Sequence, residues 1–259
     1  VFVFPDDHQR TRLTHALEVA QVAVSVSRVL GLNVALTEAI ALGHDCGHGP
    51  GGHASEDALS PYVPGGFDHA PWGADVTLVL TTQRAAPVAH EGEVVSWADR
   101  IAYVCHDFED AVEAGVVSPD QLPALVRDRC GTLRREQLSA FIVAMIDAAR
   151  LTGRVGMTSH HAEALAAFRR FNYDNIYLRP ASREQAEAVV HLLRGLVEHY
   201  AAHPHLLPAE AAADPGSPDA LHHAVAYVGG MTDRYACRQA VTLLGWPQER
   251  LPRGIDTAG

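Results

Sequence analysis

The sequence predicts an all-α fold. Apolar residues recur at helical spacing through most of the chain, glycines and prolines separate the resulting segments, and strand character is confined to residues 1–4 and 175–178. We expect a helical bundle with additional C-terminal helices, forming a single domain over residues 1–259 in which residues 120–259 are a C-terminal helical part. The expected helices are 12–30, 38–42, 93–114, 134–150, 160–171, 183–202 and 219–244.

The boundaries of these helices come from residues that start and stop them. The first helix has apolar residues at helical spacing up to Leu30, and Gly31 ends it. Thr37 is the expected cap of the short second helix, which runs into the glycine-rich segment 43–52. The polar segment 81–92 and the Ala- and Pro-rich segment 204–218 are expected to be loops.

Composition restricts the classes of partner. The chain has 259 residues, enough to bury a substantial core, and a formal net charge of -11, which argues against a nucleic-acid or anionic membrane partner. A phosphate-bearing substrate would therefore need a local basic or metal-bearing pocket. The sixteen histidines favour a metal site, because histidine is the commonest metal ligand.

Other features bear on the compartment. The four cysteines are scattered without a CxxC pair, which fits reduced thiols in a cytoplasmic protein. No apolar stretch is long enough for a membrane span, which needs about 20 residues. The chain starts at Val1, without methionine and within an apolar run, so we expect the native N-terminus to lie further upstream.

Three apolar helices are each interrupted by polar residues. His44 and Asp45 end the second helix, in the string ALGHDCGHGPGGHASED, and alone they would fit a polar surface pair. His15 interrupts the first helix, and Asp99 interrupts the helix at 93–114, where a buried aspartate without a partner is costly. Two imidazoles and two carboxylates suit a divalent ion with open positions for water and phosphate. We therefore predict a metal site formed by His15, His44, Asp45 and Asp99.

A second polar group follows in the glycine-rich segment. It consists of His48, His53, Glu56 and His69. Glu56 lies three residues after His53, on the same face if a helix starts there, and a carboxylate beside an imidazole is typical of general acid–base catalysis. The alternative interpretation is a polar surface loop.

Candidate substrate residues flank the predicted ligands. Arg12 lies one turn before the first ligand, and Arg100 directly follows Asp99, so that both are candidates for phosphate binding, although either fits a solvated arginine. Tyr103 and Asp107 are spaced four and eight residues after Asp99 and share its helical stripe. Weaker candidates are Arg169, Arg170 and Tyr173, whereas His106, Glu109 and Asp110 are assigned to the outer face or the end of their helix.

The pattern H…HD…D resembles that of the HD-domain phosphohydrolase superfamily. The surrounding strings resemble its deoxynucleoside triphosphate triphosphohydrolase, or dGTPase-like, branch. These strings span nearly the whole chain in order: RTRLTHALEVAQ, LTEAIALGHDCGHGPGGHASE, GFDHA, EGEVVSWADRIAYVCHDFEDAVEAG, RRFNYDNIY and VGGMTDRYA. The sequence departs from the pattern by lacking the usual N-terminal segment and by a shortened region near 82–89.

The resemblance implies an HD-type helical bundle whose metal site lies within residues 12–110. It implies hydrolysis of dGTP or several deoxynucleoside triphosphates to deoxynucleoside and inorganic tripolyphosphate. The implied metal ligands are the four already named, with His53 and Glu56 as the catalytic pair and His48 and His69 facing the substrate phosphates. Tyr103 is expected to contact phosphate or sugar, and Asp107 to accept a hydrogen bond from the 3′-hydroxyl.

Several alternatives stay open. A nucleoside monophosphate phosphohydrolase of the same superfamily, or a catalytically weak nucleotide-binding regulatory protein, would fit much of the sequence. One divalent ion per site is expected, and Mn, Mg, Fe, Co and Ni all suit such ligands. Relatives form homo-oligomers, hexamers among them, so we expect a homo-oligomer. The base preference and any nucleotide activation are not readable from the sequence.

Overall fold

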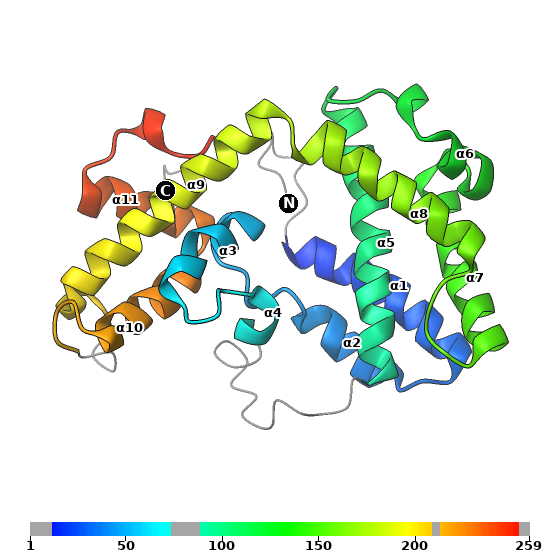
Figure 1. Ribbon diagram of the computed structural model, residues 1–259, viewed down its shortest axis with the longest axis horizontal. Coiled ribbons are helices and arrows are strands. Elements are labelled where there is room, and N and C mark those ends of the chain that lie inside the picture. The colour runs from blue at the N-terminus through cyan, green and yellow to red at the C-terminus, as the bar shows by residue number, and fades with distance from the viewer. Residues whose placement is uncertain (1–11, 74–88, 209–212, 254–259) are drawn as a thin grey trace. The chain divides into compact units, whose positions relative to one another are not determined.

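The computed structural model describes residues 12–73, 89–208 and 213–253 (Figure 1). Within these ranges every regular element is helical and there is no strand, which confirms the predicted all-α fold. The same ranges contain no helix that is both long and apolar enough to cross a bilayer. Residues 1–4, for which strand character was predicted, and residues 82–88 lie outside the described residues.

The described helices fall into two compact units, each named here after its longest helix. Among the described residues, the α5 unit comprises 12–44 and 89–179, and the α9 unit comprises 45–73, 180–208 and 213–253. The predicted division of one domain into a metal core at 12–110 and a C-terminal part at 120–259 stays a prediction.

In the α5 unit, helix α5 (His90–Glu113) packs against four other helices. These are α1 (Arg12–Leu30), α2 (Val34–Gly43), α7 (Arg134–Thr152) and α8 (Ser159–Asn172), and α6 (Ala124–Cys130) packs on α7 and α8. Figure 1 shows α5 alongside α1 and α8. The buried face of α5, which includes Val94, Ala98 and Ile101, follows helical spacing and forms much of the core of this unit.

The start of α2 differs from the prediction. The side chain of Asn33 accepts a hydrogen bond from the Leu36 backbone N–H at 3.1 Å, so Asn33 is the cap of α2. Thr37 lies inside the helix, where it is buried and its hydroxyl contacts Ser27 Oγ at 2.8 Å. The assignment of Thr37 as the cap was therefore wrong, because a threonine that bonds to a neighbouring helix is also compatible with a helix interior.

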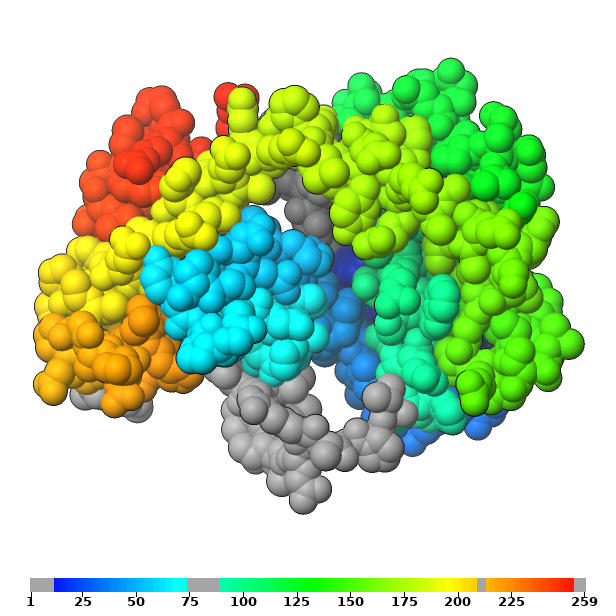
Figure 2. Space-filling model, in the orientation of Figure 1, coloured from blue at the N-terminus to red at the C-terminus, as the bar shows by residue number. Residues whose placement is uncertain are grey.

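In the α9 unit, helix α9 (Pro180–Ala202) packs against α3 (His53–Leu59), α10 (Pro218–Gly229) and α11 (Asp233–Leu244). Figure 2 shows α3 and the short helix α4 (His69–Trp72), in cyan, next to the orange surface of α10. Buried leucines at 192, 193 and 196 and Val197 carry the core along α9. The helix predicted at 219–244 is in fact two helices, because Thr232 caps a new helix after Gly230.

Two further boundaries needed correction. Residues 173–177 form a π-helix (Tyr173–Tyr177), not the strand predicted at 175–178, and Asn172 holds this turn to α5 by donating to the Val104 carbonyl at 2.9 Å. The predicted loop at 81–92 ends earlier, since residues 90–92 already belong to α5. The remaining short elements are 3-10 helices at Ser60–Tyr62, Pro119–Gln121, Pro204–Leu206 and Gln248–Arg250.

Candidate active site

Three helices of the α5 unit bring His15, His44 and Asp99 together, and we call these residues the metal triad. His15 Nε2 lies 3.0 Å from Asp99 Oδ1, and His44 Nε2 lies 3.7 Å from the same oxygen. The centroids of the two imidazole rings are 5.6 Å apart. Residues separated by up to 84 positions in sequence thus converge on one carboxylate oxygen.

The donor atoms of the metal triad fit a divalent ion. One ligand atom from each residue lies within 4.8 Å of the others. His44 Nδ1 is 2.7 Å from the Ala41 carbonyl oxygen, which can only accept, so Nδ1 carries the proton and Nε2 keeps its lone pair on the side of Asp99. Two imidazole nitrogens and a carboxylate oxygen are a mixed donor set typical of transition metals and magnesium-like ions.

The electrostatic environment keeps Asp99 ionised. Burial alone would raise the pKa of Asp99, but the hydrogen bond with His15 and the electrostatic effect of the two neighbouring imidazoles outweigh that effect. The net result is a pKa well below the ordinary value for aspartate. Asp99 is therefore anionic at neutral pH, the form in which a carboxylate binds metal.

The α9 unit holds a second group, which we call the histidine cluster: Asp45, His48, His53, Glu56 and His69. His48 Nε2 and His69 Nε2 lie 3.6 Å and 3.8 Å from Asp45 Oδ1. The rings of His48 and His69 are stacked, with centroids 3.6 Å apart and planes within 12°. The ring of His53 meets that of His48 edge-on at 4.8 Å.

Glu56 bonds to His69, whereas the sequence analysis paired it with His53. Its Oε1 accepts from His69 Nδ1 at 2.6 Å and from the His69 backbone N–H at 3.2 Å. The chain turns back after α3, which brings His69 next to Glu56. The three-residue spacing between His53 and Glu56 does not reveal this contact. Desolvation lowers the pKa of His53, although the nearby Glu56 carboxylate acts in the opposite direction. His53 is consequently neutral at pH 7.

Gly47 makes the close approach of His69 possible. A Cβ at Gly47 would lie 1.9 Å from the His69 carbonyl oxygen and 2.4 Å from the Gly73 nitrogen, so no larger residue fits without moving α4. Asp68 begins α4 by accepting from the Ala70 backbone N–H at 3.0 Å. The glycine-rich string thus sets the distance between α4 and the loop that carries His48.

Asp45 is the predicted metal ligand that the metal triad does not include. It directly follows His44 in the chain, but it belongs to the α9 unit, where its neighbours are His48 and His69. Its role as the fourth ligand stays a prediction.

The stripe of α5 beyond Asp99 is hydrogen-bonded to α8 and to the π-helix that follows it. Tyr103 accepts from Arg169 Nε at 2.9 Å, and the Arg169 guanidinium lies 4.7 Å from the ring centroid of Tyr173. Asp107 Oδ2 accepts from the Tyr177 hydroxyl at 2.6 Å. The predicted candidates Arg169 and Tyr173 are therefore next to Tyr103. The sequence analysis missed Tyr177, because nothing in the string NYDNIY indicates which of its two tyrosines reaches Asp107.

Burial raises the pKa of Tyr103 and, more strongly, that of Tyr177. Both hydroxyls are therefore protonated at neutral pH and can donate to an acceptor. Arg170 is exposed on α8, and the structure records no partner that would decide its role.

The two arginines next to the predicted ligands have different surroundings. Arg12 is the half-buried first residue of α1. Arg100 is exposed, and its guanidinium lies 5.5 Å from the ring centroid of Trp97. Phosphate binding by either stays a prediction.

His106 is buried, so its assignment to the outer face or the end of its helix was wrong. It is 3% exposed, and its Nδ1 lies 2.6 Å from Glu18 Oε2 on α1. The spacing of seven residues from Asp99 puts His106 on the same side of α5, and this could have been read from the sequence. This pair connects α1 to α5, and Glu18 lies three residues after His15 on α1.

Two family models match parts of this chain. The HD domain model matches residues 12–104, and the model of the phosphohydrolase-associated domain matches residues 155–241. A deoxyguanosinetriphosphate triphosphohydrolase-like protein of Caldanaerobacter subterraneus is 32% identical over 91% of this chain and 76% of its own length. The chain belongs to this family of HD-domain phosphohydrolases.

Other relatives carry the same name. The protein from Clostridium perfringens is 33% identical over 90% of this chain and 76% of its own length, and that from Jannaschia is 29% identical over 97% and 85%. The match to the HD domain includes the metal triad and the histidine cluster, and the match to the phosphohydrolase-associated domain includes Arg169 and Tyr177. The two matches thus cover most of the candidate residues, whereas Asp107 lies between the matched ranges.

Proposed function

We propose that this protein is a metal-dependent deoxynucleoside triphosphate triphosphohydrolase that releases a deoxynucleoside and inorganic tripolyphosphate. The observation that carries the proposal is the convergence of His15 and His44 on the carboxylate of Asp99, in a chain whose relatives are named deoxyguanosinetriphosphate triphosphohydrolase-like proteins. The bond proposed to be cleaved joins the α-phosphorus to the nucleoside oxygen, and this assignment comes from the family relation.

The metal triad is the proposed holder of one divalent ion. Asp45 follows His44 directly and remains the proposed fourth ligand. A bound ion would polarise a phosphoryl oxygen and lower the pKa of a bound water. His44 is prepared for this role by the bond from its Nδ1 to the Ala41 carbonyl, which directs the lone pair of Nε2 to the site.

The stacked rings of His48 and His69 are better suited to phosphate oxygens than to a shared ion. Their planes differ by only 12°, so an atom in the plane of one ring lies out of the plane of the other. Two parallel imidazoles can, however, each donate to a different oxygen of one phosphate group when the donating nitrogens carry protons. For His69 this requires the imidazolium form, because its Nδ1 proton is bonded to Glu56. Glu56 fixes the orientation of His69 by accepting from its Nδ1.

His53 is the proposed proton acceptor of the histidine cluster. Its lowered pKa keeps the imidazole neutral at pH 7, the form that can take a proton from an attacking water. Glu56 and His69 together can return a proton to the leaving oxygen of the nucleoside.

The stripe of α5 is the proposed site for the nucleoside and the outer phosphates. Asp107 is held by the Tyr177 hydroxyl and can accept from a sugar hydroxyl, as the family resemblance implies. Arg169, fixed by Tyr103 and stacked on Tyr173, is a cation in a defined orientation, as phosphate binding requires. Arg12 and Arg100 are further proposed phosphate contacts.

The direct experiment is a product analysis. The purified protein is incubated with each deoxynucleoside triphosphate and with Mn, Mg, Fe, Co or Ni, and the phosphate products are separated by ion-exchange chromatography. The proposal predicts tripolyphosphate and deoxynucleoside in equal amounts. Release of pyrophosphate or orthophosphate from the same substrates would show a different bond choice.

Two added substrates separate the alternatives. Turnover of dGMP but not of dGTP would identify a monophosphate phosphohydrolase. Tight binding of dGTP without turnover of dGTP, dGMP or a cyclic nucleotide would identify a regulatory nucleotide-binding protein.

A further inference from the structure

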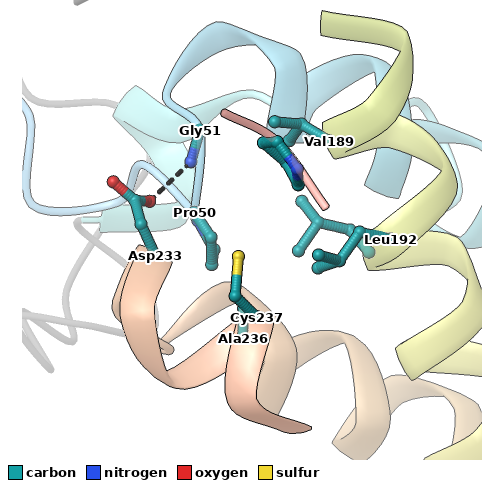
Figure 3. Close-up of a pocket in the computed structure, with 9 residues that line it drawn as sticks. Pro50, Gly51, Val189, Leu192, Asp233, Ala236 and Cys237 are labelled. Atoms are coloured by element: carbon teal, nitrogen blue, oxygen red, sulfur yellow. Dashed lines mark hydrogen bonds between the residues drawn. The ribbon is translucent and has the colours of Figure 1, made fainter. Parts of the chain in front are cut away.

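The loop between His48 and His53 is held by a residue from the other end of the sequence. Asp233, the first residue of α11, accepts a hydrogen bond from the Gly51 backbone N–H at 2.7 Å (Figure 3). The two residues are 182 positions apart, and both belong to the α9 unit. Figure 3 shows the Asp233 carboxylate pointing at this amide beside a small hollow with mostly apolar walls.

The surroundings make this bond important for the loop. Pro50, Leu192 and Cys237 are among the residues that line the hollow beside Gly51. A backbone N–H that faces such apolar atoms loses its interaction with water, and leaving it without an acceptor is costly. A bond between an amide and a carboxylate is stronger than one between two neutral groups. Asp233 therefore supplies an acceptor that the apolar wall does not.

Gly51 lies so close to α9 that a side chain at this position would collide with it. Its φ is +78°, and a Cβ at this position would lie 2.5 Å from Val189 Cγ1. On the other side of the loop, the Ser55 hydroxyl accepts from the Gly49 N–H at 3.1 Å and donates to the Gly52 carbonyl at 2.7 Å. The loop is thus fixed locally by Ser55 and from a distance by Asp233.

We propose that Asp233 is a positioning residue, which sets the orientation of His48 and His53 by fixing the backbone between them. This inference rests on the proposed function for its effect on turnover, because it assumes that the histidine cluster acts on the substrate. Asp233 reaches this loop through the Gly51 backbone N–H. Its removal should therefore affect catalysis through the backbone of residues 49–52.

The test compares three substitutions at one position. Asp233→Ala and Asp233→Ser remove the acceptor that reaches Gly51, whereas Asp233→Asn keeps an oxygen in its place. We expect kcat to fall about 10- to 100-fold in the first two, as for a small misplacement of catalytic groups, with KM and bound metal close to those of the wild type. The asparagine variant should retain kcat within a few-fold.

A second readout does not depend on activity. Hydrogen exchange measured by mass spectrometry should show faster exchange of the amides at 49–52 in the alanine and serine variants, but not in the asparagine variant. The matched control is Asp219→Ala, since Asp219 is an exposed aspartate in the first turn of α10. This control should leave both exchange at 49–52 and kcat unchanged.

The outcomes separate the two claims. Unchanged exchange at 49–52 in folded Asp233→Ala or Asp233→Ser, or equal losses of kcat in the asparagine and alanine variants, would overturn the role of Asp233. A wild-type protein that releases no phosphate product would overturn the proposed function instead, and the exchange data would still decide whether Asp233 holds the loop. Circular dichroism identifies a variant that fails to fold, in which case the other substitution decides.

Discussion

The metal triad and the histidine cluster are built in different ways. The metal triad takes one residue from each of α1, α2 and α5, or from their ends, and these three helices pack against one another. The histidine cluster lies on a glycine-rich loop and the two short helices α3 and α4. The position of the triad is therefore set by the packing of long helices, whereas that of the cluster depends on a few specific hydrogen bonds.

This difference suggests a division of roles. A site on packed helices has few alternative arrangements and suits the retention of an ion, whereas a cluster on a loop can be adjusted by contacts such as those of Glu56 and Asp233. Substitutions in the metal triad should consequently remove metal and activity together. Substitutions in the histidine cluster should lower activity while metal remains.

The largest effect is expected from Asp99→Ala. Removing the carboxylate on which both imidazoles converge should lower kcat by more than about 100-fold, the loss typical of a residue that only supports a metal ligand. Steady-state release of tripolyphosphate from dGTP provides the measurement. Glu113→Gln, an exposed acid at the end of the same helix, is the matched control and should keep full activity. Equal activity of the two variants would remove Asp99 from the site.

The next largest effect is expected from Glu56→Ala and His69→Gln. Each breaks the 2.6 Å bond between these residues, and kcat should fall about 10²- to 10⁴-fold, the range for general acid–base groups. The measurement is kcat at saturating substrate. Asp57→Asn changes the exposed neighbour of Glu56 on α3 and should have little effect. A loss of only a few-fold in both cluster variants would argue that the bond merely stabilises α4.

A smaller effect is expected from Tyr177→Phe. The change removes the hydroxyl that donates to Asp107, a bond to a charged group worth about 1.5–3 kcal/mol. If Asp107 binds the sugar, KM for dGTP should rise about tenfold or more, with a smaller change in kcat. The measurement is the initial rate of the variant as a function of dGTP concentration, which gives KM and kcat. A normal KM combined with a lower thermal midpoint would mean that the bond only stabilises the packing of α8 on α5.

The smallest effect is expected from Asn33→Ala at the start of α2. Loss of the cap should lower the free energy of unfolding by about 1 kcal/mol, because the Leu36 amide loses its acceptor. Urea unfolding measures this change, and Asn33→Asp should preserve the stability. Turnover should be unaffected, since α2 stays packed on α1 and α5. A large loss of metal in Asn33→Ala would instead show that the triad depends on local helix stability.

The same contrast decides what the sequence could predict. The bounds of α1 and the three members of the metal triad were predictable, because a histidine or an aspartate in an apolar helix stands out from its periodic surroundings. The pairing of Glu56 with His69 was not predictable, since it depends on how the chain turns between α3 and α4. Tyr177 was missed for a similar reason, because its π-helical turn has no sequence pattern of its own.

Metal content tests the account most directly. Wild-type protein, Asp99→Ala and His69→Gln are each loaded with Mn, passed through a desalting column and measured by inductively coupled plasma mass spectrometry. We predict that His69→Gln retains as much metal per chain as the wild type, whereas Asp99→Ala retains almost none. Retention of metal by Asp99→Ala, or its loss from both variants to the same extent, would contradict the assignment of the ion to the three helices of the α5 unit.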